Sequence, residues 1–380
     1  MSPLRRVYDG AAARRLRRPA LQTPDPHPHA PNRRLALAAL AALALLLSAC
    51  GEKNLPLDSL DPEGPIARDI DNLFTWVFGI AAVVFVLVEG FLVFAVLRHR
   101  RRKGEEDRAV KQSHGNTRLE ITWTVLPALL LAGIAVPTVA TQFDIRSEPE
   151  GERIEITVTG HQWWWEFEFP QYGFTTANEI HIPAGKDVYL TMTSADVIHS
   201  FWLPNLSGKR DLVPGRTSNL TLIADDPTPA GKPFFGVCAE FCGLAHADMR
   251  MLVFVDTEED FEAWAAAQAE PAIIPTEGLA AEGYDTFGQV CSACHAVAGT
   301  EYDQRRAPDL THFGGRTTFG GASIANDTAH LEEWLADPSD LKPMDPDRND
   351  LESGRILGMP NFGLDEAQID GLVALLQSWK

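Results

Sequence analysis

Two long apolar segments constrain the fold of this chain of 380 residues more than any other feature. Residues 73–97 read LFTWVFGIAAVVFVLVEGFLVFAVL, and residues 119–140 form a second such run that contains Pro127 and Pro137. Each run reaches the ~20 apolar residues that a helix needs to cross a bilayer. Because hydrocarbon offers the backbone no hydrogen-bond partners, both runs are predicted to be helices. Residues 50–142 are therefore expected to form a transmembrane helical hairpin.

The connection between the two runs gives the hairpin an orientation. It carries the basic sequence RHRRRK at 98–103, and basic connections face the cytoplasm. Both flanks, and with them the large C-terminal portion, are then expected on the outer face. Glu89 lies well inside the first run, where a contact with another helix or subunit would explain it. Glu120 lies at the cytoplasmic start of the second run, where the helix dipole also favours a carboxylate.

The N-terminal segment has the pattern of an export signal. Residues 1–34 are rich in Arg and Pro, and the apolar stretch LALAALAALALLL at 35–47 is too short for a comfortable permanent span. It ends in LSAC, which resembles a bacterial lipoprotein signal with cleavage before Cys50 and lipid on its thiol. We expect residues 1–49 to be that signal; an uncleaved anchor or an ordinary signal is the alternative.

The loop at 238–249 reads CAEFCGLAHADM and has the composition of a copper site. Soft thiolate and imidazole ligands select copper, and two thiolates four residues apart can bridge a pair of copper ions. Each ion then needs one imidazole and one weak ligand, and the second imidazole must come from a distant strand end such as DVIHSFWLP at 196–204. The alternative is a structural disulfide between the two cysteines. The expected dinuclear ligand set is His199, Cys238, Cys242, His246, Met249 and the backbone carbonyl of Glu240.

The segment around this loop alternates between apolar and polar residues from about residue 150 onward. The runs RIEITVT, WWWEFEF, EIHIP, DVYLTMT, TSNLTLI and RMLVFV, punctuated by Gly and Pro, predict the strands of a sandwich. Together with the copper loop they fit an all-β cupredoxin-like Greek-key barrel over residues 143–256. The loop is expected between the last two strands, at one end of the barrel.

A second soluble domain is predicted at residues 279–380, after a linker at 257–278 that begins as an acidic helix and ends in PAIIPTEG. Its motif CSACH is a c-type haem attachment signature, in which Cys291 and Cys294 bond the porphyrin and His295 ligates the iron. The domain is therefore expected to be an all-α class I cytochrome c, tethered flexibly to the copper domain.

Further patterns in this domain support the haem prediction. APDL at 307–310 should let the Pro308 carbonyl orient His295. Two methionines compete for the sixth position on iron, and Met359 in LGMPNF is preferred to Met344 in the charged LKPMDP. The C-terminal helix opens with Asp365 and Gln368 in capping-box spacing and should cross the first helix of the domain near Gly283.

From about residue 66 to 256 the chain resembles subunit II of haem-copper cytochrome c oxidases. The resemblance is carried by LEITWTVLP, GHQWWWEFEF, DVIHSFWLP, PGR and the copper loop. The haem segment makes it similar to the caa-type variant, in which a cytochrome c is fused to the C-terminus. The resemblance implies a subunit that passes electrons from an external cytochrome c or other donor through haem c and the dinuclear copper centre to subunit I. Oxygen reduction coupled to proton translocation would take place in subunit I, with subunit III as a further partner.

The resemblance also implies roles for single residues. Trp163 matches an aromatic near copper that receives electrons, although a packing role for all three of Trp163, Trp164 and Trp165 is the alternative. The Glu240 side chain matches a ligand of a magnesium ion shared with subunit I, and Glu120 matches a glutamate at the mouth of a proton path. Further positions that match the family's subunit interface are Asp196, Lys209, Asp211 and Arg216.

The charge distribution bears on the partners. Residues 143–380 hold 15 Lys and Arg against 39 Asp and Glu, a net formal charge of −24, so a nucleic-acid partner is not expected. An acidic surface favours a basic redox donor, or it simply keeps the domains soluble. Among other classes, a nitrous oxide reductase needs a His-rich propeller that 11 His cannot furnish. A copper-delivery protein leaves the haem motif unexplained, and a quinol oxidase subunit II is expected to lack the copper ligands.

Overall fold

The computed structural model describes Leu37 and residues 55–100, 114–229, 232–345 and 357–380. The predicted lipidation site Cys50 and most of the basic connection of the hairpin lie outside these ranges.

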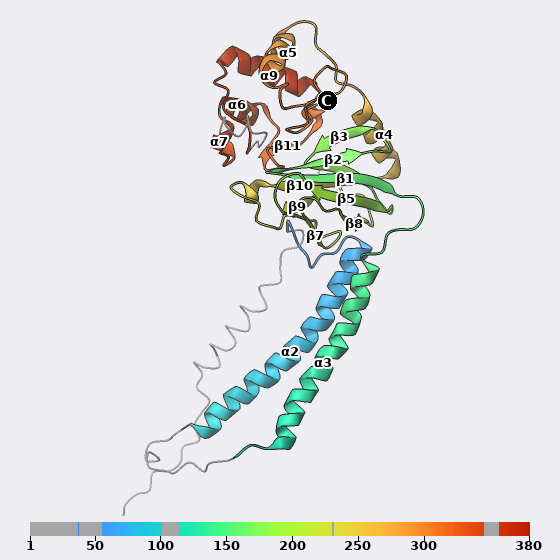
Figure 1. The fold of residues 1–380 in the computed structure, drawn as a ribbon, viewed down its shortest axis with the longest axis vertical. Coiled ribbons are helices and arrows are strands. Elements are labelled where there is room, and N and C mark those ends of the chain that lie inside the picture. The colour runs from blue at the N-terminus through green and yellow to red at the C-terminus, as the bar shows by residue number, and fades with distance from the viewer. Residues whose placement is uncertain (1–36, 38–54, 101–113, 230–231, 346–356) are drawn as a thin grey trace, which may run out of the picture. The chain divides into compact units, whose positions relative to one another are not determined.

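Two long helices form the apolar hairpin; they lie close together at one end and diverge toward the other (Figure 1). Helix α2 is Pro65–His99 and helix α3 is Thr117–Asp144. At 1.5 Å per residue, 35 and 28 residues span roughly 52 and 42 Å, which exceeds the roughly 30 Å of bilayer hydrocarbon. Their apolar side chains are largely exposed, and contact with lipid would remove this apolar surface from water. Helix α3 continues through Pro127 and Pro137.

Two five-stranded sheets make up the predicted copper domain. The first has the order β3-β2-β1-β5-β8 and the second has the order β4-β10-β9-β6-β7. Within them β1 pairs parallel to β5 and β4 pairs parallel to β10, whereas the other strand pairs are antiparallel. The strands of the first sheet are β1 (Ile154–His161), β2 (Trp164–Phe169), β3 (Phe174–Ala177), β5 (Val188–Ser194) and β8 (Ser218–Leu222). Those of the second are β4 (Glu179–Pro183), β6 (His199–Trp202), β7 (Lys209–Leu212), β9 (Phe234–Cys238) and β10 (Arg250–Asp256).

The core of this domain lies between the sheets because alternate side chains of each strand point inward. Ile156 and Val158 of β1 and Ile180 and Ile182 of β4 are fully buried in one cluster. The cupredoxin-like fold predicted from the alternating runs is confirmed. Its site loop connects β9 to β10 through a short 3-10 turn, His246–Asp248, which is the predicted place.

The predicted linker is bonded to both soluble domains. Helix α4 (Glu258–Ala269) is capped by Thr257 and buries Phe261 and Ala265 in the copper-domain core. Beyond it, the Ala272 amide donates to the Ala298 carbonyl at 3.0 Å and Trp379 Nε1 donates to Ile273 O at 3.2 Å. The segment therefore differs from the flexible tether expected from its composition, since Phe261 and Ala265 pack in the copper domain and its backbone is hydrogen-bonded to the haem domain.

The C-terminal domain is helical, as predicted, apart from one short ladder. Helices α5 and α9 cross where Gly283 meets Gly371: a Cβ on Gly283 would lie 2.0 Å from the Gly371 carbonyl oxygen. The crossing predicted near Gly283 is confirmed, and so is the capping box of Asp365 and Gln368. The elements of this domain are α5 (Leu279–Val290), a 3-10 turn (Phe313–Gly315), β11 (Thr318–Phe319), β12 (Ile324–Ala325), α6 (Thr328–Ala336), α7 (Pro338–Leu341) and α9 (Glu366–Ser378).

Candidate functional site

The two sulfurs of the copper loop lie at the centre of a compact cluster of soft ligands. Cys238 Sγ lies 3.7 Å from Cys242 Sγ, and both thiols are free and buried. His199 Nδ1 lies 3.9 Å from Cys238 Sγ. On the other side, His246 Nδ1 and Met249 Sδ lie 3.5 and 3.8 Å from Cys242 Sγ. Each sulfur thus has one imidazole beside it, which is the arrangement that a dinuclear centre requires.

Strand pairing brings His199 to the loop from a distant part of the sequence. Strands β6 and β9 are antiparallel, with Phe201 opposite Cys238, so the beginning of β6 lies beside the end of β9. A bond from the Cys238 amide to the Met249 carbonyl at 2.9 Å closes the base of the loop. Gly160 lies under His199, where a Cβ would come 2.8 Å from the imidazole. The absence of a side chain at Gly160 therefore makes room for the ring.

The weak axial ligands are also in place. Met249 is fully buried, and the Glu240 carbonyl oxygen lies 3.2 Å from Cys238 Sγ. Glu240 as a whole is exposed. Six donors of the type that copper prefers, two thiolates, two imidazoles, a thioether and a carbonyl, therefore meet around two sulfurs. The donor set fits the predicted dinuclear copper centre.

The ionisation of the two thiols is coupled. The contact with Cys242 lowers the pKa of Cys238, with further help from His199, while burial opposes it. The same contact raises the pKa of Cys242. Two thiolates this close repel one another, and bound metal cations would offset this electrostatic repulsion.

Asp196 orients His199, a role that the sequence did not reveal. Its Oδ1 lies 2.8 Å from His199 Nε2, so the other ring nitrogen, Nδ1, is directed to Cys238. This hydrogen bond lowers the pKa of Asp196 against the effect of burial and raises the pKa of His199 against the same effect. A carboxylate three residues before an imidazole ligand, as in DVIH, is the signal that could have indicated it.

Trp163 lies directly against the copper loop. Its Nε1 donates to the Cys242 carbonyl at 3.0 Å, and Gln162 Nε2 donates to the same oxygen at 2.7 Å. Trp163 and Trp165 belong to the core of the copper domain, whereas Trp164 lies outside that cluster and stacks on His161 with ring centroids 4.2 Å apart. Burial lowers the pKa of His161 to about 4, so this ring is neutral near pH 7.

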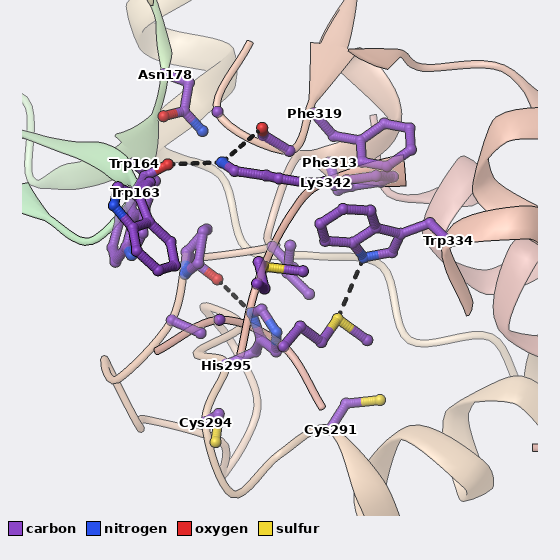
Figure 2. Close-up of a pocket in the computed structure, with 18 of the residues that line it drawn as sticks. Trp163, Trp164, Asn178, Cys291, Cys294, His295, Phe313, Phe319, Trp334 and Lys342 are labelled. Atoms are coloured by element: carbon purple, nitrogen blue, oxygen red, sulfur yellow. Dashed lines mark hydrogen bonds between the residues drawn. The ribbon is translucent and has the colours of Figure 1, made fainter. Parts of the chain in front are cut away.

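The haem-attachment residues line a pocket of the C-terminal domain (Figure 2). Cys291 and Cys294 follow helix α5 directly, and burial raises the pKa of both thiols. His295 Nδ1 lies 2.7 Å from the Pro308 carbonyl, as predicted, which leaves Nε2 free as a ligand. Burial lowers the pKa of His295, which favours the neutral ring that binds metal. Two thiols, one imidazole and apolar walls that include Phe313 and Phe319 fit a covalent haem.

Both candidate methionines line this pocket, but they have different surroundings. Met359 packs against the haem-domain core, and Trp334 Nε1 donates to its Sδ at 3.2 Å (Figure 2). Met344 packs at the edge of the copper-domain core and against Gly358. The choice of Met359 as sixth ligand stays a prediction, supported by the indole that fixes its sulfur.

The same pocket is closed on one side by the copper domain. Trp163, Trp164 and Lys342 line it together with the haem-attachment residues (Figure 2). Burial lowers the pKa of Lys342 to about 7, which nearby Asp248 partly offsets. No sequence pattern indicated this lysine, because it lies in a loop and far along the chain from its neighbours.

The remaining predicted site residue lies in the membrane hairpin. Glu120 is in the first turn of α3, which Asn116 caps by accepting bonds from two backbone amides. Glu120 is exposed, and so is Glu89 in the middle of α2. Glu120 therefore lies at the beginning of the helix, as predicted, where the helix dipole favours a carboxylate.

Comparison with known families gives three matches along the chain. Residues 57–141 match "Cytochrome C oxidase subunit II, transmembrane domain". Residues 173–255 match "Cytochrome C oxidase subunit II, periplasmic domain". Residues 280–380 match "Cytochrome c".

Two relatives that match about nine tenths of the chain are cytochrome c oxidase subunits. The chain is 39% identical to cytochrome c oxidase subunit 2 of Alkalihalophilus pseudofirmus, over 90% of this chain and 96% of the relative. It is 36% identical to cytochrome c oxidase subunit 2 of Bacillus sp. PS3, over 89% and 95%. It is also 32% identical to quinol oxidase subunit 2 of Bacillus cereus, over 63% of this chain and 82% of that protein. Among solved structures, the periplasmic domain of subunit II of cytochrome oxidase of Bradyrhizobium japonicum is 29% identical, with 32% and 95% of the chains covered and a TM-score of 0.29.

Proposed function

Because the chain belongs to the cytochrome c oxidase subunit II family and ends in a cytochrome c domain, we propose that it is the electron-input subunit of a haem-copper oxidase. Electrons pass from an external donor to haem c, then to the dinuclear copper centre and on to subunit I. There they reduce oxygen to water, coupled to proton translocation. The observation that carries the proposal is the convergence of His199 from β6 with the loop ligands around two sulfurs.

Haem c and dinuclear copper supply one-electron chemistry when they are bound. The part of the chain is to hold their ligands in place: Asp196 fixes His199, and the Pro308 carbonyl fixes His295. His199 and Met249 are fully buried, which keeps water away from these two ligands. Ligands on strand ends and a closed loop of a rigid sandwich keep their geometry when the charge of a site changes.

Trp163 is proposed as the residue through which the copper site receives electrons. It is the aromatic residue bonded to the backbone of a copper ligand, Cys242, and it lines the haem pocket at the same time. No nucleophile or acid-base pair is required of this chain, because it transfers electrons only.

Similarity to a quinol oxidase subunit 2 raises quinol as a second candidate electron donor. A quinol-oxidizing subunit II is expected to lack the copper ligands. In this chain all the proposed copper ligands are present and adjacent, and CSACH follows. The donor is therefore proposed to be a cytochrome c or another one-electron protein.

Subunits I and III are the proposed partners in the membrane, with the copper and haem domains on the outer face. Helices α2 and α3 supply the anchor, and their exposed apolar surface is available to lipid and to other subunits. Phe241 and Leu244 on the copper loop are 77% and 59% exposed, which fits a surface that another protein covers.

Further roles in the complex are proposals of the same kind. The carboxylate of the exposed Glu240 is proposed to ligate a magnesium ion together with residues of subunit I, and Glu120 to lie at the mouth of a proton path.

We propose the following domain boundaries: the hairpin comprises residues 50–142, the copper domain 143–256, the linker 257–278 and the haem domain 279–380.

The test is the metal content and the optical spectrum of the purified chain. We expect two copper ions and one covalent haem per chain, with a mixed-valence copper signal in the near infrared. If the chain binds haem but no copper, it is a cytochrome that cannot transfer electrons from haem to copper, and the proposal fails.

A further inference from the structure

Lys342 is a buried lysine at the junction of the copper and haem domains. It is 3% exposed, and its Nζ donates to the carbonyl oxygens of Trp163 and Gly320 at 2.8 Å each and of Asp248 at 3.3 Å. An ammonium group has three hydrogens, and three carbonyl oxygens surround it here. Two of the acceptors, Trp163 and Asp248, belong to the copper domain, while Gly320 belongs to the haem domain. Figure 2 shows the bond from Lys342 to Trp163.

The acceptors connect the two proposed redox sites. Trp163 is bonded through its indole to Cys242, one of the proposed copper ligands. Asp248 directly precedes Met249, another of them. Gly320 and Lys342 line the haem pocket. One side chain of the haem domain is thus hydrogen-bonded to the tryptophan that the proposed electron path uses.

The contact around Lys342 is tight because its neighbour Gly321 has no side chain. Gly321 has φ +83°, and a Cβ there would lie 2.3 Å from the Asp248 carbonyl oxygen and 2.9 Å from the Trp163 carbonyl oxygen. In addition, the Arg250 amide donates to the Gly321 carbonyl at 2.8 Å. The backbones of the two domains therefore approach closely at this point.

A second set of bonds holds the same two domains together. Glu179 at the start of β4 is 6% exposed, and its carboxylate accepts bonds from the amides of Thr317 and Thr318 at 2.9 and 2.6 Å. Both threonine hydroxyls bond to it as well. A buried carboxylate with four donors is satisfied only while the haem domain is in this position. Ala322 packs on Leu252 and Phe254 of β10 beside it.

We propose that Lys342 is a positioning residue that seats the haem pocket against Trp163, so that the chain's own haem domain occupies the approach to the copper site. The inference rests on the proposed electron path, and it states which contact holds the haem domain against Trp163. A soluble donor then delivers electrons to the haem, because the haem domain covers Trp163. Removing the ammonium group takes one donor from each of the three carbonyls, and of these Gly320 keeps the Ser323 hydroxyl as a donor. The Trp163 and Asp248 carbonyls lose their bond to the haem domain, which then no longer has one fixed place.

The experiment uses the full chain, loaded with copper and haem, in four variants. Lys342→Met removes the ammonium group, with Lys186→Met as its control, since Lys186 forms an exposed pair with Glu258 away from the junction. Gly321→Ala forces the domains apart at the same place. Its control is Gly363→Ala, since Gly363 also has a positive φ, +67°, but has open space around it.

Two quantities are measured: the rate of electron transfer from flash-reduced haem to copper, and the distance distribution between the paramagnetic centres by pulsed EPR. We expect Lys342→Met and Gly321→Ala to slow the transfer by about tenfold or more, since misplacement by about 1 Å has effects of this size, and to broaden the distribution. Both controls should match the unmodified chain, and the haem and copper spectra should be unchanged in all four.

The inference is overturned if Lys342→Met transfers electrons at the unmodified rate, or if the rate falls while the distance distribution stays narrow. Failure of the proposed function would look different: the unmodified chain itself would show no transfer from haem to copper. In that case the EPR distances would still decide whether Lys342 seats the domain.

Discussion

The indole nitrogen of Trp163 lies 3.0 Å from the carbonyl oxygen of Cys242 and donates a hydrogen bond to it. Gly243, the next residue of the loop, has φ +116°, and a Cβ on it would come 3.1 Å from the indole ring. The ring and the copper loop are thus in contact because the loop has no side chain at this point.

Trp163→Phe should slow electron transfer from haem to copper while the copper spectrum stays intact. Phenylalanine fills most of the site but cannot donate to the Cys242 carbonyl, so the connection from the ring to a copper ligand is lost. Trp164→Phe is the matched comparison, because Trp164 also lines the pocket but stacks on His161 instead. Equal effects of the two substitutions on the rate would show that Trp163 has no special role.

Cys238→Ser and Cys242→Ser should each abolish the mixed-valence copper signal. A serine hydroxyl is a poor copper ligand and cannot bridge two ions as a thiolate does. Copper per chain and the EPR spectrum give the measurement. A blue-copper spectrum with one copper per chain in the unmodified protein would contradict the dinuclear assignment.

Met359→Leu should remove the sulfur-to-iron absorption band and lower the haem midpoint potential, because a thioether axial ligand raises that potential. Met344→Leu is the control and should leave both unchanged, since Met344 packs against Gly358. A redox titration followed at haem wavelengths measures both variants. The opposite pattern would assign the sixth position to Met344.

Gly283→Ala should destabilise the haem domain by about 1–3 kcal/mol, the usual cost of overpacking. The added methyl group would meet the Gly371 carbonyl, which belongs to a helix backbone and cannot move aside. Gly288→Ala in the same helix meets only the Tyr302 hydroxyl. That variant should be near neutral, because alanine favours the helix by about 1 kcal/mol. Thermal unfolding monitored at haem wavelengths compares them, and equal melting temperatures would rule out the tight crossing.

Salt should slow the delivery of electrons from a basic donor and leave the haem-to-copper step nearly unchanged. The outer portion, residues 143–380, has a net formal charge of −24, and salt screens its long-range attraction. The internal step takes place within one chain, so its rate should also be independent of protein concentration. Rapid mixing at several ionic strengths measures both steps, and copper reduced before haem would contradict the relay.

The sequence by itself determined the parts of this protein that depend on local patterns. The apolar runs predicted α2 and α3, period-two alternation predicted the strands, and CSACH and the copper loop predicted the attachment residues of two cofactors. The copper-loop ligands lie within twelve residues of one another, so their spacing alone restricts how far apart their side chains can be. The crossing at Gly283 could be predicted because a glycine one turn before an apolar residue lets a second helix backbone approach closely.

Only the tertiary structure decided the interactions between residues that are far apart in sequence. His199 approaches Cys238 only when β6 pairs with β9, and the ring of Trp163 reaches Cys242 only when the two sheets are packed. Lys342 and Glu179 show no local pattern, because their partners lie in the other domain, 179 and 138 residues away along the chain. A hydrogen bond between domains depends on the position of whole folded surfaces, and no periodicity within either segment specifies that position.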